Sequence, residues 1–188
     1  MKKSLSEMTL EELWELFPIV LSEHKDEWKE WYAEEEKRIS SLFPNTDFRM
    51  SHIGSTAIEK IWAKPIIDIL MEIPENISME TIKQTLVCGG YICMSENKNR
   101  ISFNRGYTDK GFADKVYHLH LRYMGDNDEL YFRDYLNDNP LIAKQYEKLK
   151  LSLWKKYEHN RDLYTSSKGD FITEQTTKAK IKYKNIYL

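Results

Sequence analysis

A Gly-Ser pair and a lone aspartate carry the first chemical signal of this sequence. Gly54 and Ser55 follow the alternating segment 48–53, and Asp68 interrupts the apolar run at 66–71. A strand that ends in Gly-Ser and enters a helix can present free backbone N–H groups and a hydroxyl to a phosphate. A carboxylate in an apolar strand is costly to bury unless a cation pairs with it. The pattern indicates a cleft for phosphate and a cation, or else a capped turn beside a structural acid.

A second carboxylate accompanies Asp68. Side chains at alternate positions of an extended strand share a face, so Asp68, Leu70 and Glu72 point the same way. Magnesium prefers a few carboxylates together with water and phosphate oxygens, which makes Asp68 and Glu72 its candidate ligands. The alternative is an ion pair between Asp68 and Lys64 or an arginine.

Two histidines form a third candidate group. The segment 116–124 alternates cleanly and places His118 and His120 on one face with Arg122. Imidazoles two positions apart on a strand are a reasonable half-site for a transition metal, and they can also bind phosphate or act as acid or base. The alternative is a pair of buried, hydrogen-bonded rings. His52, on the strand that leads into Gly-Ser, could join them if the two strands are neighbours.

Basic residues near these strands complete the candidate cleft. Lys64 lies four positions before Asp68, and Arg100 and Arg105 flank a short apolar segment. A guanidinium can donate two parallel hydrogen bonds to phosphate, although each of these side chains could equally be a surface cation. The candidate contacts to phosphate or nucleotide are Gly54, Ser55, Thr56, Lys64, Arg100 and Arg105. The candidate catalytic residues are Asp68, His118 and His120.

Periodicity indicates the elements that must position these residues. Thr9 to Glu12 has the pattern of a capping box, and the run Glu34–Glu36 is expected to be a solvated helix face. Residues 105–111 are expected to form a mobile loop. The helices are expected at about 9–17, 25–42, 79–88, 128–139, 140–158 and 167–183. The strands are expected at 48–53, 66–73, 91–94, 101–103 and 116–124. The class is therefore α+β, with one domain over 1–188: a core at about 25–124 and a helical layer at 125–188.

Composition narrows the classes of function. The chain has 188 residues and a net charge of −2, so there is no global electrostatic reason to expect a nucleic-acid binder. The two cysteines, Cys88 and Cys93, are expected to be reduced. The N-terminal residues show no apolar signal-peptide segment, and no apolar run approaches the ~20 residues that span a bilayer. The expected location is the cytoplasm, without membrane contact.

Several segments together resemble a known family. They are His52-Ile-Gly-Ser-Thr-Ala-Ile58, Ala63-Lys-Pro-Ile-Ile-Asp-Ile69, His118-Leu-His120, Phe132-Arg-Asp-Tyr-Leu136 and Lys168-Gly-Asp-Phe-Ile172. With them the chain resembles the GrpB family, whose members look like the nucleotidyltransferase superfamily. The resemblance extends from about residue 28 to 179. It implies a nucleotidyltransferase-like mixed sheet flanked by helices, with a helical C-terminal third.

The resemblance also implies site residues and a metal. The superfamily pattern has Gly-Ser at a helix start, an acid-hydrophobic-acid strand and a third acid on a neighbouring strand. Here Gly54 and Ser55 fill the first element and Asp68 is the first acid, but the second acid falls on Leu70. His118 and His120 stand where the third acid is expected. These departures weaken the implied two-metal magnesium mechanism.

The leading hypothesis is an enzyme, or a descendant of one, that binds a nucleotide or another phosphorylated small molecule with Mg²⁺. Its reaction would be nucleotidyl transfer. Three alternatives stay open: a non-catalytic binding module on the same fold, a histidine metal site with hydrolytic chemistry, and an interaction protein. The last would use the aromatic-rich helices as a docking face and form a homodimer.

Overall fold

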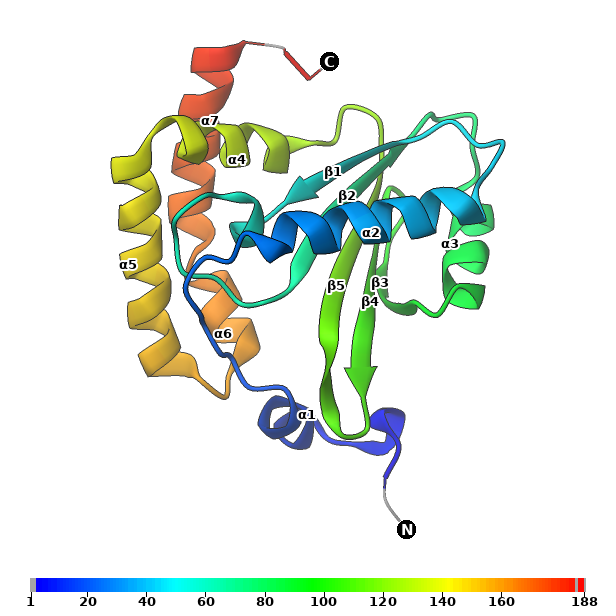
Figure 1. The fold of residues 1–188 in the computed structure, drawn as a ribbon, viewed down its shortest axis with the longest axis horizontal. Coiled ribbons are helices and arrows are strands. Elements are labelled where there is room, and N and C mark those ends of the chain that lie inside the picture. Colours follow the sequence, from blue (N-terminus) through cyan, green and yellow to red (C-terminus); the bar gives the residue numbers. More distant parts are fainter. Residues whose placement is uncertain (1–2, 185, 188) are drawn as a thin grey trace.

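A five-stranded mixed sheet forms the centre of the molecule (Figure 1). The computed structural model describes residues 3–184 and 186–187. The strands are β1 (Arg49–Ile53), β2 (Ile67–Ile73), β3 (Ile92–Glu96), β4 (Arg100–Thr108) and β5 (Gly111–Tyr123). Their order is β1-β2-β5-β4-β3, and β2 and β5 run parallel while the other neighbours are antiparallel. The mixed sheet that the sequence predicts is therefore confirmed.

Helices cover the sheet and fill the C-terminal third. They are α1 (Leu10–Leu16), α2 (Glu27–Leu42), α3 (Met79–Cys88), α4 (Asp128–Asp138), α5 (Pro140–Tyr157), α6 (Arg161–Ser166) and α7 (Gly169–Tyr183), with 3-10 turns η1 (Leu5–Glu7) and η2 (Ser55–Ala57). The capping box predicted at Thr9 is present, because its hydroxyl accepts from the backbone of Glu12, whose carboxylate accepts in return. No helix in the described part of the chain is long and apolar enough to cross a membrane.

The alternation on β2 and β5 separates two faces of the sheet. Ile67, Ile69, Tyr117 and Leu119 face the main core, which α2 and α3 complete with side chains such as Trp28. The opposite face carries Asp68, Leu70, His118 and His120, which the register pairs as Asp68 with His118 and Leu70 with His120. This two-residue period follows from strand geometry and places the polar side chains together.

The C-terminal helices pack against that second face. Leu130 of α4 packs with Ile53 and Leu70 in one buried cluster. Phe132 of α4 and Tyr146 of α5 join Ile58 and Ile61, from the segment between β1 and β2, in another. In Figure 1, α5, α6 and α7 lie together on the left, beside the end of the sheet where β1 stops. The helical layer therefore covers the face of the sheet that carries Asp68.

Two sequence predictions about local structure are wrong. Residues 105–111 do not form a loop, because β4 continues to Thr108 and β5 begins at Gly111. The hairpin continues past an irregularity at Gly106, where φ is +91° and a Cβ would lie 2.4 Å from the Lys115 carbonyl. The rings of Tyr107 and Phe112 then pack against Phe17, which follows α1, in tilted and edge-on contacts. The short helix α6 was not predicted.

The second wrong prediction concerns the solvent exposure of Glu35. It is expected on a solvated face, yet it is 2% exposed. Its carboxylate accepts hydrogen bonds from Arg38, from the Tyr91 hydroxyl at 2.8 Å and from Arg105 at 2.7 Å. The buried acid therefore ties α2 to β4 and to the residue that precedes β3. It also holds Arg105 on the core side of the sheet, away from the face that carries Asp68.

We expect Glu35→Gln to lower the free energy of unfolding by about 2 kcal/mol, because it leaves partly buried arginines without their counter-charge. Glu34→Gln is the matched control, since the neighbouring carboxylate is exposed and an exposed ion pair contributes about 0–1 kcal/mol. Urea denaturation of both variants measures the difference. Equal losses in the two variants would contradict the role assigned to Glu35.

Candidate functional site

A cavity of about 690 Å³ lies between the Asp68 face of the sheet and the C-terminal helices. Its floor comes from β1, β2 and β5, and its walls come from α4, α5, α6 and α7. Six of the residues that the sequence selected line it: Gly54, Ser55, Lys64, Asp68, His118 and His120. The strands thus bring together residues that lie up to 66 positions apart in the chain.

Gly54 is required by the position of the Asp68 carboxylate. Antiparallel pairing places Ile53 opposite Asp68, so the chain leaves β1 directly beside the acid. Gly54 has φ +70°, and a Cβ built on it would lie 2.2 Å from Asp68 Oδ2. Only glycine allows both the backbone conformation and the close approach. Glycine is therefore required at position 54 both by the backbone conformation of the turn and by the space that the Asp68 carboxylate occupies.

Asp68 ends a chain of hydrogen bonds that crosses the cavity floor. Arg161 donates to the Tyr107 hydroxyl at 2.9 Å, and that hydroxyl lies 2.8 Å from His118 Nε2. His118 Nδ1 lies 3.2 Å from Asp68 Oδ1. Because a carboxylate only accepts, His118 carries a proton on Nδ1 and accepts at Nε2 from Tyr107. The chain runs from Arg161 through Tyr107 and His118 to Asp68.

The same contacts set the charge of the acid. Burial alone would raise the pKa of Asp68, but hydrogen bonds from His118 and His120 hold that pKa well below its usual range. Burial lowers the pKa of His118. Asp68 is therefore an anion at neutral pH and His118 a neutral donor to it. His120 Nε2 lies further from the carboxylate, at 3.8 Å.

Four cations surround the acid, and sequence analysis missed three of them. Lys64 precedes β2, Lys150 lies on α5, Arg161 begins α6 and Lys168 caps α7. Burial lowers the pKa of Lys64 and of Lys150 to about 7, and that of Lys168 to about 8. Mutual repulsion adds to the effect, because Lys168 lowers the pKa of the other two lysines.

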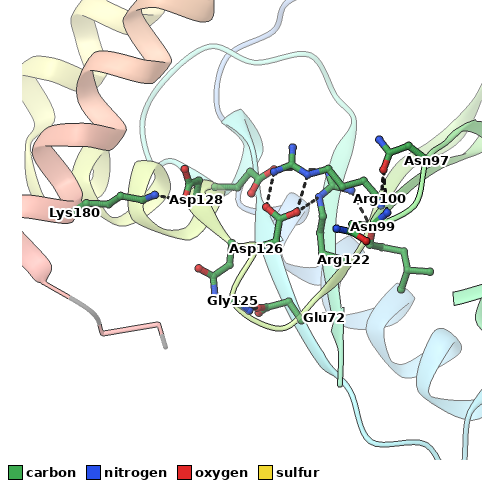
Figure 2. Close-up of polar contacts among 12 residues, drawn as sticks. Glu72, Asn97, Asn99, Arg100, Arg122, Gly125, Asp126, Asp128 and Lys180 are labelled. Atoms are coloured by element: carbon green, nitrogen blue, oxygen red, sulfur yellow. Dashed lines mark hydrogen bonds and ion pairs between the residues drawn. The ribbon is translucent and has the colours of Figure 1, made fainter. Parts of the chain in front are cut away.

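The carboxylates at the rim of the cavity are already paired. Asp128 lies 2.5 Å from Lys180 (Figure 2). Glu129 lies 3.8 Å from Arg122. Asp126, which does not line the cavity, lies between Arg100, at 2.5 Å, and Arg122, at 3.7 Å. These pairs neutralise the rim, so the excess positive charge belongs to the interior.

Several predicted site residues lie elsewhere. Thr56 is buried and donates to the Ile66 carbonyl, and it bonds His52, whose ring stacks on Tyr32 of α2. His52 therefore does not join His118 and His120. Arg105 is held by Glu35, as described above. Arg100 shares the Asp68 face but is paired with Asp126, and neither arginine lines the cavity.

Glu72 does not accompany Asp68 as a metal ligand. It is 2% exposed and accepts hydrogen bonds from the backbone N–H of Gly125 and the amide of Asn127 (Figure 2). Leu70, at the expected second acid, is fully buried. Within the residues that the structure describes, no group of three or more His, Cys, Asp or Glu side chains is placed to hold a metal ion. The donor set does not fit the magnesium centre that the resemblance implies.

The histidine pair is a poor metal half-site for a related reason. Both ring nitrogens of His118 are engaged, one by Asp68 and one by Tyr107. A metal ligand needs one nitrogen free of a proton and of a competing donor. His118 would have to release Tyr107 to bind a metal.

Lys150 and Lys168 could have been found from helical spacing. The buried stripe of α5 is Ala143, Tyr146, Glu147 and Lys150, so a lysine occupies a position where an apolar residue is expected. Lys168 lies four positions before Ile172 of α7, which also lines the cavity. A lysine on the stripe of a helix that otherwise carries buried residues is the sequence signal that could have identified these two site residues. Arg161 gave no such signal, because α6 was not predicted.

The fold and the cavity define a class: an α+β protein in which a Gly-Ser strand end meets an aspartate beneath a basic helical layer. The chain belongs to the GrpB family, whose model, described as GrpB protein, matches residues 18–178. The sequence resemblance is thereby confirmed.

Two relatives illustrate the relationship, and one more distant structure also matches. The glutamate-rich protein GrpB of Alkalihalophilus pseudofirmus is 34% identical over 83% of this chain and 92% of its own. The crystal structure of the conserved protein GrpB from Enterococcus faecalis has a TM-score of 0.76 and 27% identity, and the match covers 87% of this chain and 99% of that one. The Cid1 poly(U) polymerase matches at a TM-score of 0.49 and 10% identity, over 71% and 43% of the two chains.

The buried lysine predicts how stability depends on pH. The pKa of Lys150 is about 7 in the folded protein and about 10.4 in an unfolded chain, so unfolding takes up a proton between these values. The free energy of unfolding should therefore rise with pH in this window. We expect Lys150→Met to reduce that slope by up to about 1.4 kcal/mol per pH unit.

Lys148→Met is the matched control, because this lysine lies on the exposed side of the same helix. Urea denaturation from pH 7 to 10 compares the two variants with the unsubstituted protein. Identical slopes in all three proteins would contradict the lowered pKa assigned to Lys150.

Proposed function

We propose that this GrpB-family protein binds a nucleotide or another phosphorylated small molecule in the cavity between β2, β5 and the C-terminal helices. One observation carries the proposal: Lys64, Lys150, Arg161 and Lys168 converge on a cavity whose inner carboxylate is Asp68. An anion with several charges is the ligand that such a site favours.

The remaining walls suit the organic part of a nucleotide. Phe132, Tyr146, Tyr164 and Ile172 line the same cavity as the cations. Ligand sites commonly combine an apolar lining with a few convergent polar groups, and a volume of this order holds a molecule of nucleotide size. The apolar wall therefore supports a phosphorylated organic molecule over a simple inorganic anion.

Of the two forms of this function, ligand binding without nucleotidyl transfer accords better with the geometry. Nucleotidyl transfer by two metals needs further carboxylates, but the second acid position is Leu70, a core residue, and histidines stand where the third acid is expected. Glu72, the other carboxylate on this face, is a buried structural acid. Gly54 and Asp68 retain the first part of that arrangement. We therefore favour a binding module over an active transferase, with turnover of ATP in the presence of magnesium or manganese as the discriminating assay.

Titration calorimetry with ATP and with GTP, each with and without magnesium, tests the proposal directly. Binding of either nucleotide in either condition supports it. We expect Lys168→Ala to weaken the affinity about tenfold or more, because a charge-assisted hydrogen bond to phosphate is lost.

Lys178→Ala is the control on the same helix, since Lys178 is exposed and pairs with Glu174. It should bind within about twofold of the unsubstituted protein, as expected for an exposed surface charge. Failure of both nucleotides to bind in all conditions would refute the nucleotide form of the proposed function.

A further inference from the structure

The interior of the cavity has more positive charge than its own residues neutralise. Lys64, Lys150, Arg161 and Lys168 all line it, and within the described part of the chain none of them forms a salt bridge with a carboxylate. Asp68 is the inner acid, and it is engaged by two histidines. Holding like charges together in a half-buried space is unfavourable unless a ligand compensates them.

The four cations approach from separate elements. Lys64 and Lys168 both lie over the ring of Tyr164, with their Nζ atoms 5.4 and 4.4 Å from its centroid. Lys150 lies over the ring of Tyr146 at 4.9 Å and donates to the Trp62 carbonyl. These aromatic and carbonyl contacts hold the ammonium groups in place without neutralising them.

Arg161 occupies another side of the cavity. One of its nitrogens donates to Tyr107, which fixes the position of the guanidinium. Among the residues that the structure describes, its other N–H groups have no hydrogen-bond partner and can donate to a ligand. Cations distributed over several walls suit a chain of phosphates better than a single phosphate group. Each phosphate can then meet a different donor.

A divalent cation finds little to bind in the same space. The Asp68 carboxylate already accepts from His118, and Glu72 and Leu70 offer no second ligand. An added dication would also be repelled by the four cations around it. The role that a metal plays in phosphate binding, neutralising the phosphate chain, is here available from side chains.

We infer that the cavity binds a di- or triphosphate chain directly on Lys64, Lys150, Arg161 and Lys168, with no divalent cation between the protein and the ligand. The inference rests on the proposed function and specifies its ligand. It predicts that free ATP binds at least as tightly as ATP complexed with magnesium, because the metal cancels charge that the cations would otherwise meet. It also predicts that affinity grows with the number of phosphates.

The test is titration calorimetry of the purified protein with ATP, ADP, AMP and inorganic triphosphate, in EDTA and in excess magnesium. In EDTA, ATP should bind about tenfold or more tightly than AMP, since each additional phosphate gains at least one charge-assisted contact. Inorganic triphosphate should compete with ATP. Tighter binding of ATP in magnesium than in EDTA, or equal binding of AMP and ATP, would overturn the inference.

Asp68→Asn separates this account from a metal site. The substituted amide keeps an oxygen that can accept from His118 Nδ1 but removes a negative charge next to the phosphates, so ATP affinity should rise. A carboxylate that held magnesium would give the opposite result, a loss of magnesium-dependent binding. Circular dichroism and the melting temperature check that the variant is folded.

The outcomes separate the inference from the proposed function. If ATP binds only with magnesium, and Asp68→Asn abolishes that binding, then the inference is wrong and the proposed function stands. If neither nucleotides nor triphosphate bind in any condition, then the proposed function fails and the inference fails with it.

Discussion

The contact between Gly54 and the Asp68 carboxylate is the constraint on which the rest of the site depends. A Cβ at position 54 would lie 2.2 Å from the acid, so the β1 turn and the carboxylate can share this space only because the residue is glycine. The antiparallel register of β1 and β2 makes the contact, and the parallel register of β2 and β5 adds His118 on the other side. Backbone pairing alone therefore assembles the floor of the cavity.

The helical layer then contributes positive charge around the Asp68 carboxylate. Lys150 and Lys168 reach the cavity from α5 and from the start of α7, and Arg161 from α6. Burial and mutual repulsion keep the lysine pKa values low, which means that the lysines of the free protein are ready to regain protons when an anion enters. This is an unfavourable arrangement for stability alone. It is a reasonable one for a site whose ligand supplies the missing negative charge.

Strand periodicity explains what the sequence could predict. Alternation along 66–73 places Asp68 with Leu70 and Glu72 on one face of its strand, and alternation along 116–124 places His118 with His120 on one face of theirs. Gly54 was selected because a Gly-Ser pair follows a strand there. Alternation does not show which strands are neighbours in the sheet. For that reason the sequence could join His52 to the other histidines only on the condition that the two strands are neighbours. The condition is not met, because β2 lies between β1 and β5, and the His52 ring stacks on Tyr32 of α2.

Distance along the strands and the packing of the helices explain the site residues that the sequence misplaced or missed. Arg100 pairs in register with Arg122 while Ser102 pairs with His120, so Arg100 lies two residues, or about 7 Å at the usual rise, beyond the cavity floor. Arg105 faces the core because it follows Phe103 by two positions, a relation hidden by the expectation of a loop. The inward cations of α5 to α7 depend on how the helices dock, which helical periodicity indicates only for buried stripes.

The most direct measurement of the central claim is the proton uptake that accompanies ATP binding. Calorimetry at pH 8 without magnesium, in buffers with different ionisation enthalpies, gives the number of protons bound. If phosphates contact lysines whose pKa values are about 7 to 8 in the free protein, binding must raise those values and take up protons from solution. The account predicts net uptake that decreases in Lys150→Met. Binding with no change in protonation would contradict it.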